Sequence, residues 1–403
     1  MKSIEKLAIH GGEPVRRDRM PPRFALGPDE VAELMKAIEF YKVQGEDPPY
    51  QGPYERLFCD AFSAYQGGGY ADAVSSGTAG IYIGLKSLRL PPGSEVMISP
   101  VTDSGPLSCI IEQGFKPVVV DSAPDSYNIG VAQFRERISA KTSAIVLIHA
   151  GGEPVPEINE ITAEAKRRGV KVLEDCAQAI GAHVGGRKTG TFGDIAAFST
   201  MYRKNLAAAA SSGLVFTQSD ALYNLALSYA DRGKPVWRSD IDLRNPGYAF
   251  FPALNWNTDD LSCAIGLANL RRLEDTNERR KTFLRTLIKR MKSDVDICRP
   301  YAFHEGFSPF YFPIFVDCNQ ITCTKIEFAE ALAKEGIGLG AHYGCLVNTW
   351  EWARPYLSDG FVTENALSTR DRCFHLYVNE NYGAREVDDI IAAMQKVEHH
   401  FAQ

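Results

Sequence analysis

Between about residues 70 and 217 the sequence alternates short apolar runs with helix-like segments, and this alternation restricts the possible folds more than any other feature. The runs are bounded by turn residues and are mostly rich in β-branched side chains, as is typical of buried strands. They span residues 95–101, 116–121, 143–150, 170–175 and 195–200, with helical patterns over 78–88, 105–114 and 157–169 between them. The alternation predicts an α/β/α domain with a mainly parallel sheet, in which ligands bind at the carboxyl ends of the strands.

The pattern changes after residue 220. Residues 259–293 predict one long amphipathic helix, because apolar side chains recur at helical spacing before a strongly charged continuation. A strand-like run at 310–317, a helix at 325–336 and a closing helix at 385–401 follow. We therefore predict a large domain over residues 1–258 and a smaller α+β domain over residues 259–403.

The composition restricts the class of protein. The 403 residues are 45% hydrophobic and 23% charged, as in an ordinary globular protein, and the net charge of −6 offers no basic surface for nucleic acid. The nine cysteines form no Cys-x-x-Cys pair, which argues against a zinc site and against a disulfide framework. No apolar run reaches 18 residues, so no membrane span is expected. We expect a cytoplasmic enzyme that holds no metal.

Small and acidic residues mark the first two segments suited to chemistry. In "SSGTAG", residues 75–80, small residues precede a helix, where free N–H groups and the Thr78 hydroxyl favour an anion. The alternative is an ordinary capped helix start. Further on, Glu174 and Asp175 end a buried strand, where α/β folds display functional groups. The alternative here is that both residues only cap the next helix.

The third and fourth segments add a lysine and two polar residues. Ser199 ends the next strand and could bind phosphate or only form a turn. Lys204 precedes a run of small residues, which leaves room for a Schiff base between its amine and a cofactor aldehyde, although a surface charge is the alternative. Asn255 stands just before the long helix and could donate its amide to a phosphate or serve only at the helix entry.

Together these segments closely resemble the DegT/DnrJ/EryC1/StrS family of fold-type-I, pyridoxal-phosphate-dependent aminotransferases, which act on keto-sugars and cyclitols. The resemblance covers nearly the whole chain, and its best-matching parts are "SSGTAG", "EDCAQAIGAHVGGRKTGTFGDIAAFS" and "KNL". It implies a fold-type-I transferase that binds pyridoxal 5'-phosphate (PLP) and forms a homodimer with shared active sites.

The resemblance also implies a role for each site residue. Lys204 would form the internal aldimine with PLP and move the proton during transfer, and Asp175 would pair with the pyridine nitrogen. Gln178 would lie near the ring hydroxyl. The phosphate would be bound by Gly77, Thr78 and Ser199 and, from a neighbouring subunit, by its Asn255.

Two departures from the family pattern stand out. Family members usually place an aromatic side chain after the threonine of a Pro-x-x-Thr segment, where it stacks on the cofactor ring. Here Asp103 and then Ser104 follow Thr102, and neither can stack, although we place Asp103 among the residues that contact the cofactor. After the lysine, the family's acidic residue and paired glycines give way to Ser211, Ser212 and Gly213.

The sequence therefore predicts an aminotransferase that moves an amino group from glutamate or glutamine to a nucleotide-linked keto-sugar or a keto-cyclitol. The alternatives are elimination or other chemistry at Cα in the same fold, and a non-catalytic PLP-binding relative. Lys204 argues against the dehydratase branch of the family, which has histidine in its place. A dinucleotide dehydrogenase is disfavoured because no Gly-x-Gly-x-x-Gly follows a strand. His149 and His342 lie at predicted loop or strand-end positions, where packing or surface hydrogen bonding is the commoner role.

Overall fold

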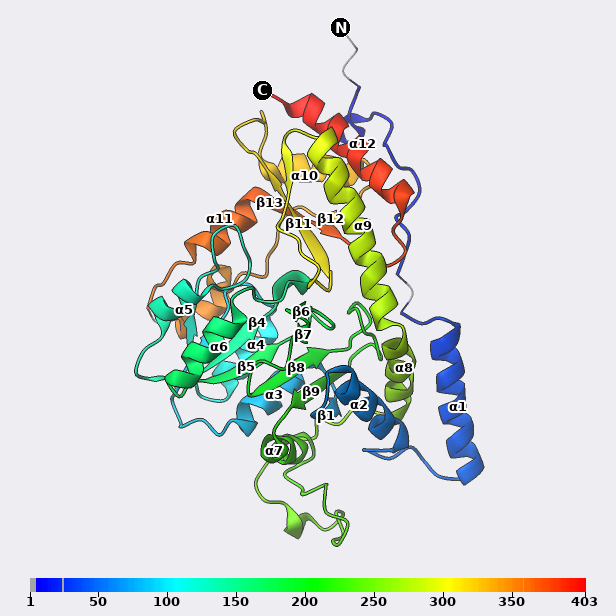
Figure 1. Ribbon diagram of the computed structural model, residues 1–403, viewed down its shortest axis with the longest axis vertical. Helices are drawn as coiled ribbons and strands as arrows, with labels where there is room; N and C mark the ends of the chain where they lie inside the picture. The colour runs from blue at the N-terminus through cyan, green and yellow to red at the C-terminus, as the bar shows by residue number, and fades with distance from the viewer. Residues whose placement is uncertain (1–4, 24, 358) are drawn as a thin grey trace.

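The computed structural model describes residues 5–23, 25–357 and 359–403, and a seven-stranded sheet forms its main body (Figure 1). The strand order is β1-β9-β8-β5-β4-β2-β3. The strands are β1 (Tyr70–Val74), β2 (Glu95–Ile98), β3 (Lys116–Val119), β4 (Thr142–Ile148), β5 (Lys171–Asp175), β8 (Ile195–Ser199) and β9 (Gly213–Thr217). Strands β8, β5, β4, β2 and β3 run parallel to one another, and β9 is antiparallel to its two neighbours, β1 and β8. The predicted mainly parallel sheet is confirmed, and all five predicted strands belong to it.

Helices cover both faces of this sheet, because successive side chains of a strand point to opposite faces. On one face, Val146 and Leu173 pack with α3 (Gly77–Ser87), α4 (Ser104–Glu112) and α7 (Asp220–Ala230). On the other face, Ile145 and Val172 pack with α5 (Val131–Arg137) and α6 (Ile158–Arg167), while β8 and β9 pack with α2 (Pro53–Tyr65) and α8 (Asp260–Arg271). The predicted α/β/α layering is therefore confirmed.

A second sheet, antiparallel and four-stranded, forms in the C-terminal third in the order β10-β11-β13-β12. Helix α9 packs against α12, and both lie along this sheet in the upper part of Figure 1. The elements are α9 (Leu273–Asp294), β10 (Cys298–Pro300), β11 (Tyr311–Val316), α10 (Lys325–Lys334), β12 (Leu339–Gly340), α11 (Glu364–Arg372), β13 (Cys373–Tyr377) and α12 (Ala384–Phe401). The predicted α+β character of this region is confirmed.

The remaining elements are peripheral to both sheets. They are α1 (Pro28–Gln44), the hairpin of β6 (His183–Val184) and β7 (Arg187–Lys188), and short 3₁₀ turns at Ala8–His10, Ala150–Gly152, Pro246–Tyr248, Val347–Thr349 and Glu351–Tyr356. No helix in the described ranges is long and apolar enough to cross a membrane.

The predicted single helix over residues 259–293 is wrong. Helix α8 ends at Arg271 and α9 begins at Leu273, because Arg272 between them leaves helical geometry, with φ −106° and ψ 5°. The break lets α8 pack against α1 and α2 while α9 turns towards α12. The domain boundary at residue 258 stays a prediction, and α8 lies with the elements that precede it.

A buried arginine on α9 joins distant parts of the chain. The Arg280 guanidinium donates twice to Glu380 Oε2, at 2.7 and 3.1 Å, and once to the Pro309 carbonyl at 2.9 Å. It also donates to Asn205 Oδ1. Arg23, from the N-terminal segment, donates to Glu380 Oε1 at 3.2 Å and to the Asn205 carbonyl at 2.9 Å. Because Arg280 is only 1% exposed, its charge depends on Glu380 for compensation.

We predict that Glu380→Gln lowers the free energy of unfolding by about 3–5 kcal/mol, because it leaves the buried Arg280 charge without a counterion. Denaturant unfolding followed by circular dichroism measures the change. Glu305→Gln is the control: Glu305 pairs with Arg285 at the surface, where its side chain is 62% exposed, so less than about 1 kcal/mol should be lost. Equal losses in the two variants would contradict the prediction.

Candidate active site

Lys204 lies in the loop that connects β8 to β9, and this loop is fixed on both sides of it. The Lys204 N–H donates to the Met201 carbonyl at 2.8 Å, and the Ala208 N–H donates to the Thr200 carbonyl at 2.8 Å. The next residue, Asn205, is buried and donates from Nδ2 to Asn277 Oδ1 and to Ser308 Oγ, both at 2.8 Å. The lysine backbone is thereby placed independently of its side chain.

The side chain of Lys204 points inward and is available to a ligand. Its Nζ lies 4.4 Å from the centre of the Phe310 ring, and within the described ranges it has no hydrogen-bond or ion-pair partner. Burial lowers the pKa of Lys204, while the negative charges of Asp175 and Asp103 partly oppose that shift. A buried, unpaired amine of lowered pKa is the form in which lysine acts as a nucleophile. This environment favours the predicted Schiff-base role over an ordinary surface charge, and the role itself stays a prediction.

Asp175 is the last residue of β5, at the carboxyl edge of the sheet, and it is only 5% exposed. Its Oδ1 accepts a hydrogen bond of 3.0 Å from the Ala177 N–H. Burial raises the pKa of Asp175, and the Ala177 hydrogen bond and the positive charge of Lys204 oppose the shift. The two residues predicted to be catalytic thus lie within electrostatic reach of each other in one buried site.

The start of α3 and the end of β8 make up the predicted anion cradle, whose binding of phosphate stays a prediction. Ser76 caps the helix, and its Oγ accepts from the Ala79 N–H at 3.0 Å, so the capped helix start given as the alternative is present. The N–H groups of Gly77 and Thr78 have no acceptor among the described residues. Ser199, at the end of β8, lies directly against this turn: a Cβ on Gly77 would come 2.8 Å from Ser199 Cβ. The three residues predicted to bind phosphate therefore lie together at a helix N-terminus.

Gln178 and Asp103 each lie near other predicted site residues. Gln178 Oε1 accepts from the Gly151 N–H at 2.8 Å, and its side chain lies beside Tyr343. Asp103 caps α4, and its Oδ1 accepts from the Gly105 N–H at 3.0 Å. The charge of Asp103 acts on both Lys204 and Asp175, and contact of Asp103 with the cofactor stays a prediction.

Asn255 lies beside the segment that precedes α3, because the carbonyl of the next residue, Trp256, accepts from the Ser75 N–H at 2.8 Å. Asn255 is exposed, donates from Nδ2 to Tyr50 Oη at 3.2 Å, and accepts from Asn257 Nδ2 at 2.8 Å. An outward-facing Asn255 is compatible with contact to a second subunit, which stays a prediction.

The two histidines considered in the sequence, His149 and His342, differ in burial. His149 is buried: its Nε2 lies 3.0 Å from Glu174 Oε2, and its Nδ1 accepts from the Val155 N–H at 3.0 Å. Glu174 further accepts from the N–H groups of Gly190, Phe192 and Gly193 at 2.8, 2.7 and 2.6 Å. With these partners His149 and Glu174 serve packing, although with Cys176 they form a group of metal-ligand type. His342 is exposed.

Sequence reasoning missed three residues of the site: Phe310, Tyr343 and Cys345. Phe310 supports Lys204, Tyr343 lies beside Gln178, and the charge of Lys204 acts on the Cys345 thiol. All three come from the C-terminal third, more than 100 positions beyond Lys204. The only local signal was the glycine-flanked "GAHYG", in which His342 was considered as a site residue and the adjacent Tyr343 was not.

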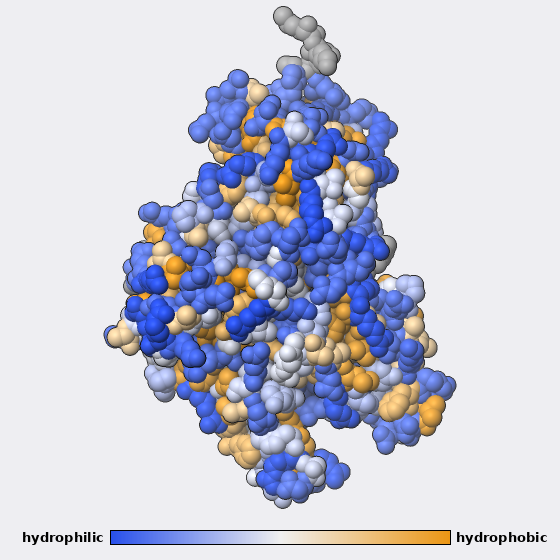
Figure 2. Space-filling model, in the orientation of Figure 1, coloured by the Kyte–Doolittle hydropathy of each residue, from blue (hydrophilic) through white to orange (hydrophobic). Residues whose placement is uncertain are grey.

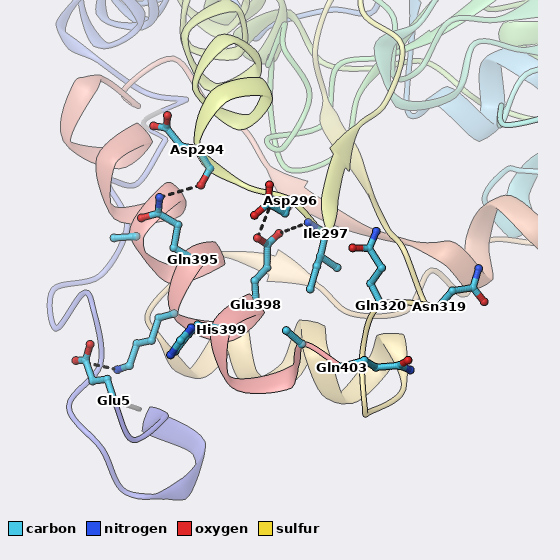
Figure 3. Close-up of a pocket in the computed structure, with 13 residues that line it drawn as sticks. Glu5, Asp294, Asp296, Ile297, Asn319, Gln320, Gln395, Glu398, His399 and Gln403 are labelled. Carbon is cyan, nitrogen blue, oxygen red and sulfur yellow. Dashed lines mark hydrogen bonds and ion pairs between the residues drawn. The ribbon is translucent and has the colours of Figure 1, made fainter. Parts of the chain in front are cut away.

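A separate hollow of about 890 Å³ lies at the far end of the C-terminal region (Figure 3). Two of its acidic side chains, Glu398 and Glu5, have partners. Glu398 accepts from the N–H groups of Asp296, Ile297 and Cys298 at 3.0, 3.1 and 2.7 Å, and Glu5 lies 3.6 Å from Lys396. Among the residues that line it there is none of the predicted site, so this hollow is structural.

The residues present fit PLP by their chemistry. Lys204 supplies a buried amine for the aldehyde, the start of α3 supplies free N–H groups for the phosphate, and Asp175 supplies an acid for the ring nitrogen. This donor set, at the carboxyl edge of a mainly parallel sheet, defines a PLP-dependent enzyme.

The chain belongs to the DegT/DnrJ/EryC1/StrS aminotransferase family, whose model matches residues 31–395. It is 28% identical over 388 residues to the spore coat polysaccharide biosynthesis protein SpsC of Bacillus subtilis (92% of this chain, 95% of that protein). It is 30% identical over 251 residues to GDP-perosamine synthase of Escherichia coli O157:H7 (61% and 65%). Both the family and the dependence on PLP that the sequence predicted are confirmed.

Solved structures confirm the fold. The aminotransferase from Psychrobacter cryohalolentis superposes with a TM-score of 0.84 at 21% identity, covering 94% of this chain and 98% of that one. Helicobacter pylori PseC, an aminotransferase involved in the biosynthesis of pseudoaminic acid, gives 0.82 at 19% identity, covering 95% and 99%.

We predict that Gly77→Ala damages the anion cradle. The added methyl group would meet Ser199 Cβ at 2.8 Å, and overpacking of this kind costs about 1–3 kcal/mol. We expect unfolding at lower urea concentration and PLP binding weakened about tenfold, measured by fluorescence titration. Gly338→Ala is the control, because its methyl group would find only ordinary contacts from 3.6 Å. A Gly77→Ala protein that binds PLP as well as this control would contradict the prediction.

Proposed function

We propose that the enzyme moves an amino group from glutamate or glutamine to a keto group on a nucleotide-linked sugar or a cyclitol. The observation that carries the proposal is the buried, unpaired amine of Lys204 within reach of the Asp175 carboxylate. Support for a sugar acceptor comes from the names of relatives: one is a GDP-perosamine synthase, and another acts in spore coat polysaccharide biosynthesis.

The proposed roles follow from the position and charge of each side chain. When bound, PLP supplies an aldehyde that condenses with amines and a ring that withdraws electrons from the adjacent carbon. Burial favours the neutral amine of Lys204, which can accept a proton from the carbon that carries the amino group and return one to the acceptor carbon. Asp175 would hold the proton on the ring nitrogen.

The other residues bind and orient. The N–H groups at Gly77 and Thr78, with the Ser199 hydroxyl, would hold the phosphate. Gln178, fixed by the Gly151 N–H, would lie beside the ring hydroxyl. Phe310 packs against the Lys204 side chain and limits the access of water to its amine.

We predict that borohydride fixes PLP to Lys204, so that mass spectrometry finds the cofactor on the peptide containing this residue. The Lys204→Ala variant should lose the absorption of the bound cofactor and at least about 10³-fold in transfer rate. Amino donors and keto acceptors are then tested as a panel, with ammonia release measured in parallel. Amino transfer supports the proposal, whereas ammonia release without transfer would favour elimination. A fully active Lys204→Ala enzyme would overturn both the transfer reaction and the elimination reaction as roles for this lysine.

The surface supports a homodimer. On α1, Val31, Met35 and Ile38 are 40–56% exposed and lie at helical spacing on one face, while Ala37 and Tyr41 pack inward. Figure 2 shows hydrophobic colour over α1, at the lower right. Exposed apolar stripes of this kind mark protein–protein contacts. We infer that a second copy covers this face and that its Asn255 completes the phosphate site.

If each active site contains residues from two subunits, two different inactive variants should complement each other in a mixed dimer. Lys204→Ala and Asn255→Ala should each be impaired alone, and Asn255→Ala should weaken PLP binding. When the two proteins are mixed and allowed to exchange subunits, half of the dimers carry one site with both residues intact, so activity should rise above that of either parent. Exchange is followed by light scattering and native mass spectrometry. Mixed dimers without any gain in activity would contradict shared sites.

A further inference from the structure

The site has no aromatic side chain at the start of α4, where the family usually places one over the cofactor ring. Asp103 cannot take this role, because its carboxylate caps α4 through the Gly105 N–H at 3.0 Å. Ser104 is the first residue of the helix and is exposed. A side chain from another part of the chain could therefore contact this face of the ring.

A segment from the C-terminal third lies at this position. The Thr102 N–H donates to the Cys345 carbonyl at 3.1 Å, and the Val347 N–H donates to the Pro100 carbonyl at 2.9 Å. Between these bonds Val101 and Leu346 form an antiparallel bridge. Cys345 is therefore held beside Thr102, one residue from Asp103, by backbone hydrogen bonds.

The Cys345 side chain points into the site. Leu346 is buried in the core at 1% exposure, and in an extended segment neighbouring side chains point to opposite sides, so Cys345 points away from that core. The charges of Lys204 and Asp103 both act on the Cys345 thiol, and the Tyr343 hydroxyl lies beside it. Cys345 is only half-buried, whereas six other cysteines are buried in the core. Its thiol is thus accessible from the site that holds Lys204.

We propose that the Cys345 thiol packs against the cofactor ring and takes the place of the missing aromatic side chain. The inference rests on the proposed position of PLP between Lys204 and the start of α3. Sulfur is polarizable and makes favourable contacts with aromatic rings, so a thiol can supply part of the contact that stacking supplies elsewhere. Bound PLP should accordingly shield this thiol from solvent.

Thiol labelling tests the contact directly. The holoenzyme is freed of PLP with hydroxylamine, and samples with and without added PLP are alkylated with N-ethylmaleimide at pH 8.5, because burial raises the pKa of the Cys345 thiol. Peptide mass spectrometry gives the labelling rate at each cysteine. Cys318 and Cys323, exposed and half-buried on the loop before α10, are internal controls. We expect PLP to slow labelling at Cys345 about tenfold or more and to leave both controls unchanged.

A second measurement uses variants. Cys345→Ala should weaken PLP binding about two- to tenfold, the range that corresponds to the loss of one sulfur–aromatic contact, and Cys323→Ala should leave it unchanged. Asp103→Tyr in the Cys345→Ala background should recover part of the affinity by restoring an aromatic side chain.

The outcomes separate this inference from the proposed function. If borohydride fixes PLP on Lys204 while Cys345 is labelled as fast with PLP as without it, the inference is wrong and the proposed function stands. If PLP is not fixed on Lys204, both fail. Equal protection of Cys345 and of the two control thiols would also overturn the inference, because a general tightening of the protein would then explain the shielding.

Discussion

The buried Arg280 guanidinium is the interaction on which the arrangement of the site depends. It binds Glu380, Pro309 and Asn205, which come from three separate stretches of chain, and Arg23 adds the N-terminal segment. Because Asn205 follows Lys204 directly, the position of the lysine is set by contacts with the C-terminal third.

The site keeps its reactive groups apart while holding each in position. Lys204 and Asp175 act on each other electrostatically but form no ion pair: Asp175 accepts a backbone N–H, and Lys204 packs on Phe310. Asp103 is likewise occupied as a helix cap. A direct Lys204–Asp175 ion pair would satisfy both charges and leave neither free for a ligand. Support from the backbone and from an aromatic ring leaves both side chains available.

Much of the large domain could be predicted from local pattern, and the remainder depended on contacts distant in sequence. The five central strands were predicted because their apolar runs are buried on both faces. Strands β1 and β9 were not predicted; β1 carries the buried polar Asp72 at its centre, which interrupts its apolar run. The break at Arg272 carries no glycine or proline and follows from the different packing partners of α8 and α9. In the site, strand ends predicted Asp175 and Ser199, whereas Cys345 reaches it only through pairing with residues 100–102.

The serines after the lysine connect the two ends of the site. Ser211 Oγ donates to the Ser75 carbonyl at 2.7 Å, and Gly213 packs so closely on the next turn that a Cβ there would come 2.5 Å from the Ser76 carbonyl carbon. The loop that carries Lys204 is therefore fastened to the anion cradle. By thermodynamic linkage, an anion bound at the start of α3 and an ordered lysine loop stabilise each other to the same extent. A cofactor phosphate bound there, as we propose, would therefore also order the loop that carries the Lys204 amine.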